Sequence, residues 1–361
     1  MTYTIIGMGA IGGYYGGRLA HAGRMVRFLS HSDYQHVLQH GLRVDSCDGD
    51  FVLPSIEAYG QAADIPESDV VIVGLKSVKN HDVLPQLLQP LVTNHTVVIL
   101  IQNGIGLEDD LQELFPGLKI IAGLAFICSA KVGPGHINHQ CYGSINLGNY
   151  SCPDDRFHDI LLDLQDAGLE AAEVPYLEAR WKKAVWNMPF NGMTVALDTS
   201  TDRLLKNPAT RQLIYDQMME VIGAANALGV ETLTAEFADK MIQMTDDMVP
   251  YSPSMKLDYD FHRPMEIEYL YTRPIAEAKK VGFDMPKLAM LEALLRFRQA
   301  YRVCWFLAER EMVAISIDAD GMVAVDGAGE DGTREVVEKE ALDGALHRTC
   351  TELGVVALAG E

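Results

Sequence analysis

Lys183, Asn187 and Asn191 recur at four-residue intervals within an otherwise apolar stretch, WKKAVWNMPFN. On an α-helix each step of four residues advances about 40° beyond a full turn, so these side chains share a stripe roughly 80° wide. An ammonium group and two amides on one stripe can stabilise a developing oxyanion, deliver a proton and hydrogen-bond a carboxylate. The spacing favours a helix that lines a ligand-binding cleft, and a stripe that bonds water or a neighbouring helix is the alternative. Pro189 predicts a kink between the two asparagines.

The first residues carry a glycine pattern that can hold a phosphate group. Gly7, Gly9 and Gly12 form GxGxxG between a strand-like run, residues 3–6, and a helical segment that extends to Ala22. The first glycine permits a tight turn, the second lets a pyrophosphate approach bare backbone, and the third lets the helix pack on the strand. Free N–H groups at the helix N-terminus would face the phosphates. The pattern therefore predicts a dinucleotide site formed by Gly7, Met8, Gly9, Ala10, Ile11 and Gly12.

The end of the second predicted strand, residues 25–30, indicates which dinucleotide binds. An Asp or Glu there would bind the adenosine 2′-hydroxyl group and favour NAD. The chain has Ser30 and His31 instead, with Arg27 just upstream, and Asp33 is expected to begin the next helix. Because hydroxyls and an imidazole can receive a 2′-phosphate, Ser30 and His31 are predicted to bind NADP.

Two more apolar runs are typical of parallel strands that are covered on both faces. Lys76 ends the first run, residues 69–76, and Asn103 lies near the end of the second, residues 96–106. Ligands of open α/β sheets bind at the carboxyl ends of the strands, so Lys76 and Asn103 are expected to contact cofactor or substrate. Solvated loop positions are the alternative reading for both residues.

The strands after residue 118 are expected to close the sheet. Residues 119–130 predict one strand, and the alternation over residues 135–150 predicts an antiparallel partner. His136 and His139 lie in that partner, and the sequence offers them no metal-ligand set. They are therefore expected to be structural.

The pattern becomes helical from about residue 175. Ser254 is predicted to cap one helix, and Pro264 is predicted in the first turn of the next, which puts Glu266 near a helix N-terminus. The predicted fold class is α/β, with an N-terminal doubly wound Rossmann sheet (residues 1–174) and a C-terminal all-helical domain (residues 175–308). Residues 309–361 form an acidic extension, expected as a hairpin over residues 313–327 plus a helix, or as a poorly ordered segment.

Composition and charge exclude several classes of function. The net charge of −21 opposes nucleic acid and anionic membranes. No apolar run approaches the roughly 20 residues that span a bilayer. The six cysteines include no CxxC pair, which argues against a zinc site or a disulfide framework. The chain has no room for a signal peptide before the glycine loop. The expectation is a cytoplasmic protein without a metal.

Five motifs occur together: GxGxxG, GLK ending at Lys76, QNGIG around Asn103, W-x-K-x3-N-x3-N, and S-M-x2-D with a glutamate twelve residues beyond its serine. Their combination resembles the ketopantoate reductase family over roughly residues 1–300. The resemblance implies a Rossmann domain and a helical domain with the active site between them. It also implies NADPH-dependent reduction of 2-dehydropantoate, a 2-oxo acid, to (R)-pantoate on the way to pantothenate and coenzyme A.

The resemblance further implies a role for each matching residue. Lys183 matches the family's catalytic lysine, and Glu266 matches its carboxylate that holds the substrate hydroxyl group. Asp258 is expected to serve structure or domain closure. Asn187, Asn191 and Ser254 match the family's substrate-binding positions. Asn103 matches an asparagine that contacts both cofactor and substrate, and Lys76 matches a lysine near the cofactor.

The chain departs from the family pattern at three places. Gly192 replaces a usual proline, Ser30 replaces a usual arginine, and the acidic extension is additional. The first departure keeps another branched 2-oxo acid open as the substrate, and the second keeps NADH open as a less favoured cofactor.

The chemistry agrees with these roles. Hydride transfer to a ketone leaves negative charge on its oxygen, which a lysine ammonium group can stabilise and protonate. Desolvation would lower the pKa of that lysine towards the working pH. Two alternatives remain: a related dehydrogenase of a 3-hydroxy acid or opine, and a non-catalytic NADP-binding regulator. Glu266 and Ser254 favour the reductase, and a homodimer is left open.

Overall fold

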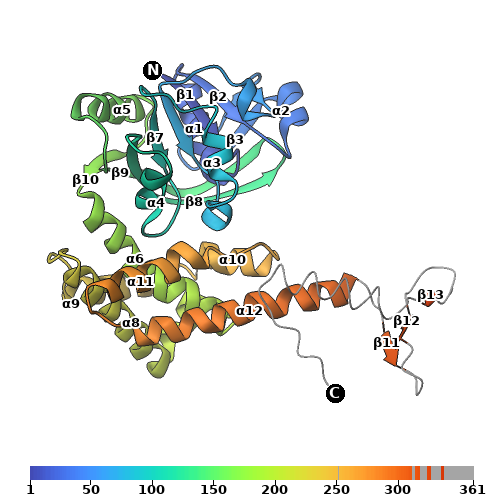
Figure 1. Cartoon of the computed structure of the whole chain (residues 1–361), viewed down its shortest axis with the longest axis vertical. Coiled ribbons are helices and arrows are strands. Elements are labelled where there is room, and N and C mark those ends of the chain that lie inside the picture. Colours follow the sequence, from blue (N-terminus) through green and yellow to red (C-terminus); the bar gives the residue numbers. More distant parts are fainter. Residues whose placement is uncertain (251, 311–313, 318–322, 327–334, 337–361) are drawn as a thin grey trace.

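The computed structural model of the chain describes residues 1–250, 252–310, 314–317, 323–326 and 335–336. Figure 1 shows a sheet-containing domain above a layer of helices, and the chain passes from one to the other between β10 and α6. The fold is therefore α/β with a separate helical part, as the sequence predicts.

A ten-stranded sheet forms the first domain, in the order β4-β3-β9-β8-β7-β6-β1-β2-β5, with β10 beside β9. Strands β8, β7, β6, β1, β2 and β5 are mutually parallel, whereas β9 runs antiparallel to β8. The strands are β1 (Thr2–Ile6), β2 (Met25–Leu29), β3 (Leu42–Ser46), β4 (Phe51–Leu53), β5 (Glu57–Tyr59), β6 (Val70–Val73), β7 (Val97–Leu100), β8 (Lys119–Gly133), β9 (His136–Asn149) and β10 (Ala171–Val174).

Helices cover both faces of this sheet. Every residue of β6 and β7 is buried, as expected for parallel strands between two helical layers. Tyr14 of α1 and Phe157 of α5 share one core with alternate strand residues such as Ile5, whereas Leu84 of α3 and Leu111 of α4 share the other core. These helices are α1 (Ala10–His21), α2 (Tyr34–His40), α3 (Leu84–Leu88), α4 (Leu107–Leu114) and α5 (Asp154–Asp166).

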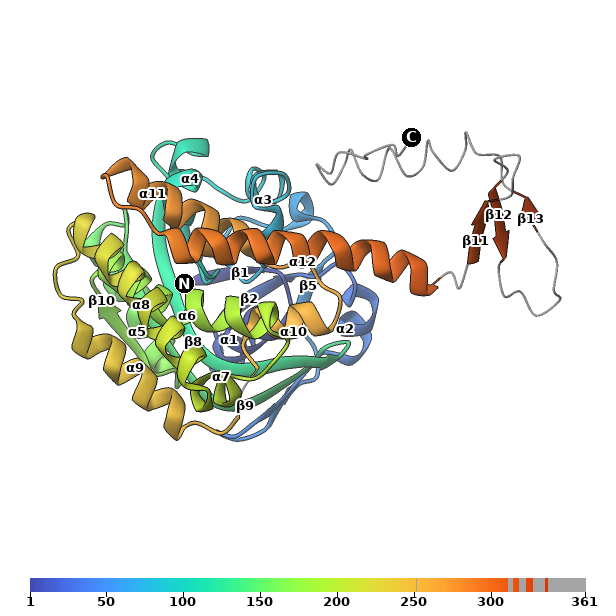
Figure 2. The same cartoon turned by 90° about the horizontal axis from the view of Figure 1, so that it is seen from below.

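Strands β8 and β9 form a hairpin that is much longer than the other strands. They span 15 and 14 residues, and Figure 2 shows them as long curved ribbons of the sheet. The antiparallel pairing predicted for residues 135–150 is confirmed. Strands β3 and β4, which pair beyond β9, were not predicted.

The second domain is a set of packed helices. Trp181 and Met188 of α6, Met218 of α8 and Leu291 of α12 belong to one buried apolar cluster. The elements are α6 (Tyr176–Ala196), α7 (Thr201–Lys206), α8 (Pro208–Ala227), α9 (Ala235–Asp247), α10 (Ser254–Asp260), a π-helical turn η3 (Glu268–Thr272), α11 (Arg273–Lys280) and α12 (Pro286–Arg310).

Pro189 lies inside α6, which is helical over its whole range. Two predictions about helix boundaries are wrong. Ser254 does not cap α10; it is the first helical residue, and the backbone N–H of Met255 is capped instead by Oδ1 of Asn191 at 3.0 Å. Pro264 lies in a non-helical segment, and helical residues begin only at Ile267, directly after Glu266.

Beyond α12 the structure describes three short strands, β11 (Ala314–Ile317), β12 (Val323–Asp326) and β13 (Glu335–Val336). β11 and β12 are antiparallel and lie within the hairpin expected over residues 313–327. The acidic helix expected after them lies outside the described residues. Within the described part of the chain, no helix combines the length and apolarity that crossing a membrane requires.

Candidate active site

The glycine loop has the backbone geometry that a dinucleotide needs. Gly7 has φ +91°, and a Cβ atom at Gly12 would lie 2.1 Å from the Gly7 carbonyl oxygen. By contrast, a Cβ atom at Gly9, the N-cap of α1, would meet no heavy atom within 4 Å. No side chain caps α1, and its first turn holds no acidic residue. The open side of Gly9 and the free N–H groups of α1 therefore fit a pyrophosphate.

At the end of β2, Ser30 is buried and His31 is exposed. Arg27 does not serve this tip, because its guanidinium contacts Glu57 Oε1 at 3.1 Å and the Glu67 carbonyl at 2.9 Å. The cation at the tip is Lys131 of β8, whose Nζ lies 2.6 Å from Asp33 Oδ1 and 3.5 Å from Ser32 Oγ. Lys131 is about a hundred positions away in sequence, which is why sequence reasoning missed it.

Lys76 and Ser77, in the segment that follows β6, contact residues of the helical domain. Lys76 forms an ion pair with Asp258 of α10, and Arg263 Nε lies 2.9 Å from the other oxygen of that buried carboxylate. Ser77 donates its backbone N–H and its hydroxyl to Oε1 of Glu266, at 2.8 and 2.9 Å. The two domains therefore meet through Asp258 and Glu266.

The ammonium group of Lys183 lies at the same junction. Its Nζ donates to the carbonyl oxygen of Ala125 in β8 at 2.8 Å. Burial, helped by the positive charge of Arg180, lowers the pKa of Lys183 to about 7, although Glu266 opposes that shift. Burial raises the pKa of Glu266, despite its hydrogen bonds from Ser77 and the charge of Lys76. Lys183 and Glu266 therefore lie close enough at this junction for the charge of Glu266 to act on Lys183.

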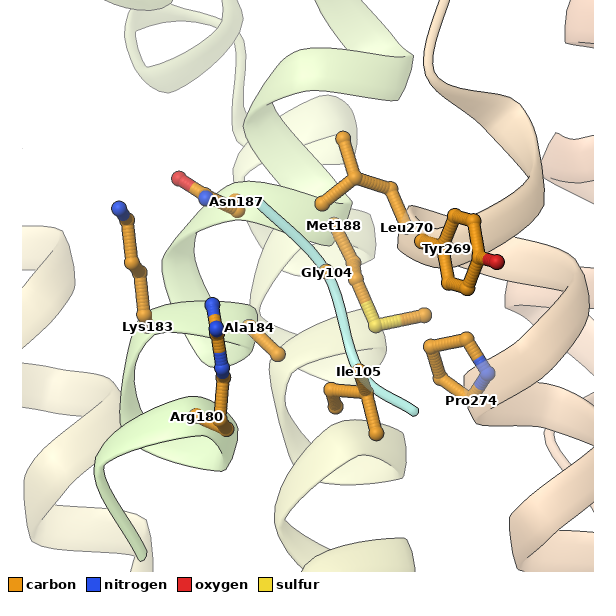
Figure 3. A pocket seen from close by; sticks show the side chains of 10 residues that line it. All are labelled: Gly104, Ile105, Arg180, Lys183, Ala184, Asn187, Met188, Tyr269, Leu270 and Pro274. Atoms are coloured by element: carbon orange, nitrogen blue, oxygen red, sulfur yellow. The ribbon is translucent and has the colours of Figure 1, made fainter. Parts of the chain in front are cut away.

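Lys183 and Asn187 line one small pocket, as their spacing predicts (Figure 3). The loop after β7 forms another wall of the pocket, and its residue Gly104 follows Asn103 directly. Asn191, the third member of the stripe, is buried. Its Oδ1 accepts a hydrogen bond from the backbone N–H of Met255 at the N-terminus of α10. The other lining residues are Ile105, Arg180, Ala184, Met188, Tyr269, Leu270 and Pro274.

Arg180 was not predicted, although it lies one helical turn before Lys183 on the same helix face. It is almost fully buried, donates to the Gln102 carbonyl at 2.7 Å and forms an ion pair with Glu108, which is also fully buried. The spacing of three residues between Arg180 and Lys183 was the signal that could have identified it.

A phosphate-binding Rossmann loop, joined to a helical domain that brings a partly buried lysine and a buried glutamate to the strand ends, defines a two-domain nicotinamide-dependent oxidoreductase. The sequence assigns it further. The family model described as ketopantoate reductase PanE/ApbA matches residues 3–151, and its C-terminal counterpart matches residues 176–299. The chain therefore belongs to the ketopantoate reductase family.

Known proteins resemble the chain over most of its length. The 2-dehydropantoate 2-reductase of a Nostoc species is 44% identical over 302 residues, which cover 82% of this chain and 94% of that protein. The crystal structure of 2-dehydropantoate 2-reductase from Geobacter metallireducens is 37% identical with TM-score 0.79, covering 82% of this chain and 99% of that one. D-Mandelate dehydrogenase, solved with NADH and anilino(oxo)acetate, shares the fold, with TM-score 0.76 and 23% identity over 83% of this chain and 99% of that one.

Proposed function

We propose that this protein reduces 2-dehydropantoate to (R)-pantoate with NADPH, a step towards pantothenate and coenzyme A. The relatives from Nostoc and Geobacter, both named 2-dehydropantoate 2-reductase, support this reaction. The observation that carries the proposal is the partly buried Lys183 at the domain junction, whose lowered pKa of about 7 makes it an acid that works near neutral pH.

The chain's own residues would orient the substrate and supply the proton. A bound nicotinamide would supply the hydride. Lys183 would stabilise the charge that develops on the ketone oxygen and donate its proton there. Because Ser77 donates both hydrogen bonds to Oε1 of Glu266, Oε2 is the oxygen that would accept a bond from a substrate hydroxyl group. Asn187 would donate to the carboxylate without adding charge, with Asn103, Asn191 and Ser254 as further substrate positions.

The proposal assigns the cofactor to residues 7–12 and to the end of β2. The open face of Gly9 would receive the pyrophosphate, as its surroundings suit. Ser30 and His31 flank the adenosine ribose in this assignment, and Lys76 lies at the end of β6. Lys131 beside Ser32 is the cation that favours the 2′-phosphate of NADPH over NADH.

The test compares neighbouring lysines of α6. Lys183→Ala is expected to lower kcat/KM for 2-dehydropantoate with NADPH by about 10²- to 10⁴-fold, because it removes a general acid and an oxyanion donor. Lys182→Ala is the control, since its ammonium pairs with Glu178 and is 43% exposed. The control should change kcat/KM by no more than about two-fold. Near-normal kcat/KM in Lys183→Ala would remove the basis of the proposal.

A second candidate is the reduction of another branched 2-oxo acid. The pocket wall formed by Ile105, Met188 and Leu270 is apolar and would accept other branched side chains. A panel of 2-oxo acids assayed by NADPH absorbance separates the two candidates through their kcat/KM values. Tight NADPH binding without turnover of any oxo acid would instead indicate a regulator.

A further inference from the structure

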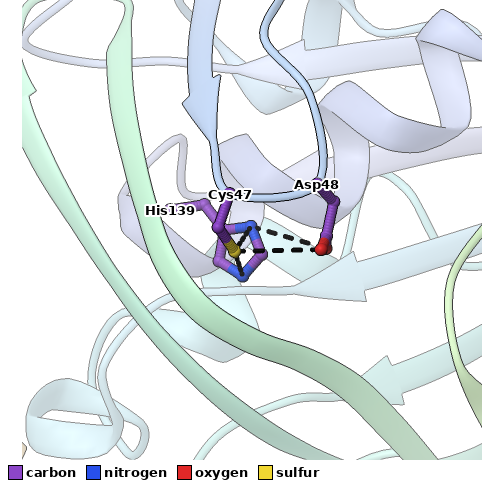
Figure 4. A group of neighbouring side chains, drawn as sticks. All are labelled: Cys47, Asp48 and His139. Atoms are coloured by element: carbon purple, nitrogen blue, oxygen red, sulfur yellow. Dashed lines mark hydrogen bonds and ion pairs between the residues drawn. The ribbon is translucent and has the colours of Figure 1, made fainter.

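Cys47, Asp48 and His139 form a cluster on the sheet domain, outside the reduction site. Cys47 and Asp48 lie in the turn between β3 and β4, and His139 lies in β9 (Figure 4). One ligand atom from each residue lies within 4.8 Å of the other two. From this geometry we propose that the cluster is a binding site for a single divalent cation of the zinc type, held by the Cys47 thiolate, the Asp48 carboxylate and Nδ1 of His139.

The hydrogen bonds of His139 present the lone pair that a metal requires. Its ring is buried, and Nε2 lies 3.0 Å from the carbonyl oxygen of Tyr142. A carbonyl oxygen only accepts, so Nε2 carries the proton and the lone pair is left on Nδ1. A metal-binding histidine is commonly fixed in this way by a backbone carbonyl at its second nitrogen. The sequence offered His139 no ligand set because its partners are about ninety positions away.

The backbone of β9 is irregular where it supplies this carbonyl group. Tyr142 has φ +63°, a left-handed conformation that residues other than glycine rarely adopt. The pairing of β8 with β9 shifts register on both sides of this segment, between Phe126 and Ile127 and between Cys128 and Ser129. The irregularity brings the Tyr142 carbonyl back onto the imidazole of His139.

Nδ1 of His139 lies 3.8 Å from Cys47 Sγ and 3.9 Å from Asp48 Oδ2. The sulfur is also 3.9 Å from Nε2, so in this conformation it lies off the direction of the Nδ1 lone pair. In a tetrahedral zinc site with ordinary bond lengths, sulfur and nitrogen are about 3.5 Å apart, and nitrogen and oxygen about 3.4 Å. Closing the site therefore requires the exposed Cys47 side chain to rotate towards Nδ1 and the Ser46 hydroxyl to leave it. The hydroxyl of Ser46, 2.8 Å from Nδ1, holds the position that the cation would take.

The Asp48 carboxylate lies beside the Cys47 thiol, with Sγ 3.8 Å from Oδ1. A bound dication would stabilise a thiolate and a carboxylate together. Thiolate, imidazole and carboxylate are ligands that zinc accepts, and a water molecule would complete four-coordination. Cys47 and Asp48 are exposed, so a cation reaches the site from solvent.

The position of the cluster indicates a stabilising role. Tyr14 of α1 packs on the His139 ring, with the ring centroids 4.3 Å apart. A cation there would join the β3–β4 turn to β9 beneath α1, whose first residue follows Gly9 of the phosphate loop. Metal binding to the folded state raises its stability by mass action.

The test titrates the purified full-length chain, cleared of metal by a chelator and kept reduced without thiols, with Zn²⁺ or Co²⁺. We expect one equivalent to bind, Tm to rise with Zn²⁺, and the Co²⁺ form to show a thiolate-to-metal charge-transfer band. Cys47→Ser and Asp48→Asn should each weaken binding by about tenfold or more. Cys152→Ala is the matched thiol control, because Cys152 is buried away from the cluster and should leave binding unchanged.

Binding that survives both Cys47→Ser and Asp48→Asn would overturn the proposal, since it would reflect unspecific cations on an acidic protein. The same holds if no equivalent binds to the reduced chain, or if the Co²⁺ form lacks the thiolate band. Circular dichroism confirms folding of each variant, and Asp48→Asn keeps the test valid if Cys47→Ser does not fold. None of these readouts requires turnover, so they are independent of the proposed reduction.

Discussion

The acidity of the Lys183 ammonium group depends on its surroundings as well as on its residue type. An exposed lysine is fully protonated at neutral pH and is a poor acid, whereas burial beside Arg180 lowers the pKa of Lys183 to about 7. Glu266 supplies a counter-charge that limits this shift. The site therefore has an acid that loses its proton within the physiological pH range.

The pH dependence of reduction follows from that pKa. Lys183 is protonated and can donate below about pH 7, and it loses this ability as the pH rises above that value. We expect kcat/KM for reduction to fall with rising pH along a limb near pH 7. A series of kcat/KM measurements across neutral pH, at constant ionic strength, checks this expectation.

Two variants test whether the fall of kcat/KM near pH 7 is caused by Lys183. Glu266→Gln removes the charge that favours the ammonium form, so the limb should move to lower pH. Lys183→Arg carries a guanidinium that stays protonated, so the limb should disappear along with most of the activity. A limb that keeps its position in both variants would belong to another group.

Cofactor preference is a second test at the scale of one residue. Lys131→Ala should raise the KM for NADPH by about tenfold or more, because a charge-assisted bond to the 2′-phosphate is lost. The KM for NADH, which has no 2′-phosphate, should stay within about two-fold. Lys119→Ala is the control on the same strand, since its Nζ donates to the Asn94 carbonyl at 2.8 Å. Equal changes for both cofactors would remove Lys131 from phosphate recognition.

At the scale of elements, a buried ion pair joins α6 to α4 of the sheet domain. Glu108 of α4 and Arg180 of α6 are both almost fully buried, and Tyr176 also donates to Glu108 at 3.2 Å. Glu108→Gln leaves the Arg180 charge buried without a counter-charge, which is expected to cost roughly 3–5 kcal/mol of stability. Denaturant unfolding of the variant measures this loss.

The control for this prediction is an ion pair on the outside of the same helix. Glu178→Gln breaks the pair with Lys182, which is 43% exposed, and should cost no more than about 1 kcal/mol. A similar cost for the two variants would mean that Arg180 finds compensation elsewhere.

The sequence predicts these elements to different degrees. Helical periodicity alone places Lys183 and Asn187 on one face of α6, so their shared pocket was predictable. The use of Asn191 to cap α10 was not, because it depends on how two helices far apart in sequence pack. The glycine at position 192 also depends on tertiary packing. A Cβ atom there would lie 2.5 Å from the Leu291 side chain and 2.6 Å from the Tyr271 hydroxyl. Tertiary contacts of this kind leave no local pattern in a single sequence.

At the scale of the whole molecule, the site exists only where the two domains touch. Lys183 donates to Ala125, Ser77 donates to Glu266, and Lys76 pairs with Asp258, so each contact joins a residue of the sheet domain to one of the helical domain. Neither domain alone carries both the phosphate loop and the lysine. Catalysis is therefore expected to depend on how closely the domains approach.

The last residues of the chain provide a test at this scale. Every residue assigned to the reduction precedes residue 267, and the family match ends at residue 299. A chain that ends after Arg310 keeps all of α12 as well as these groups. We expect it to retain kcat/KM within about two-fold, because truncation affects activity only through the contacts that it removes. Steady-state assays of the two chains, with matched NADPH affinity measurements, decide the question. A loss of tenfold or more would assign residues 311–361 a part in the site that the remaining structure does not require.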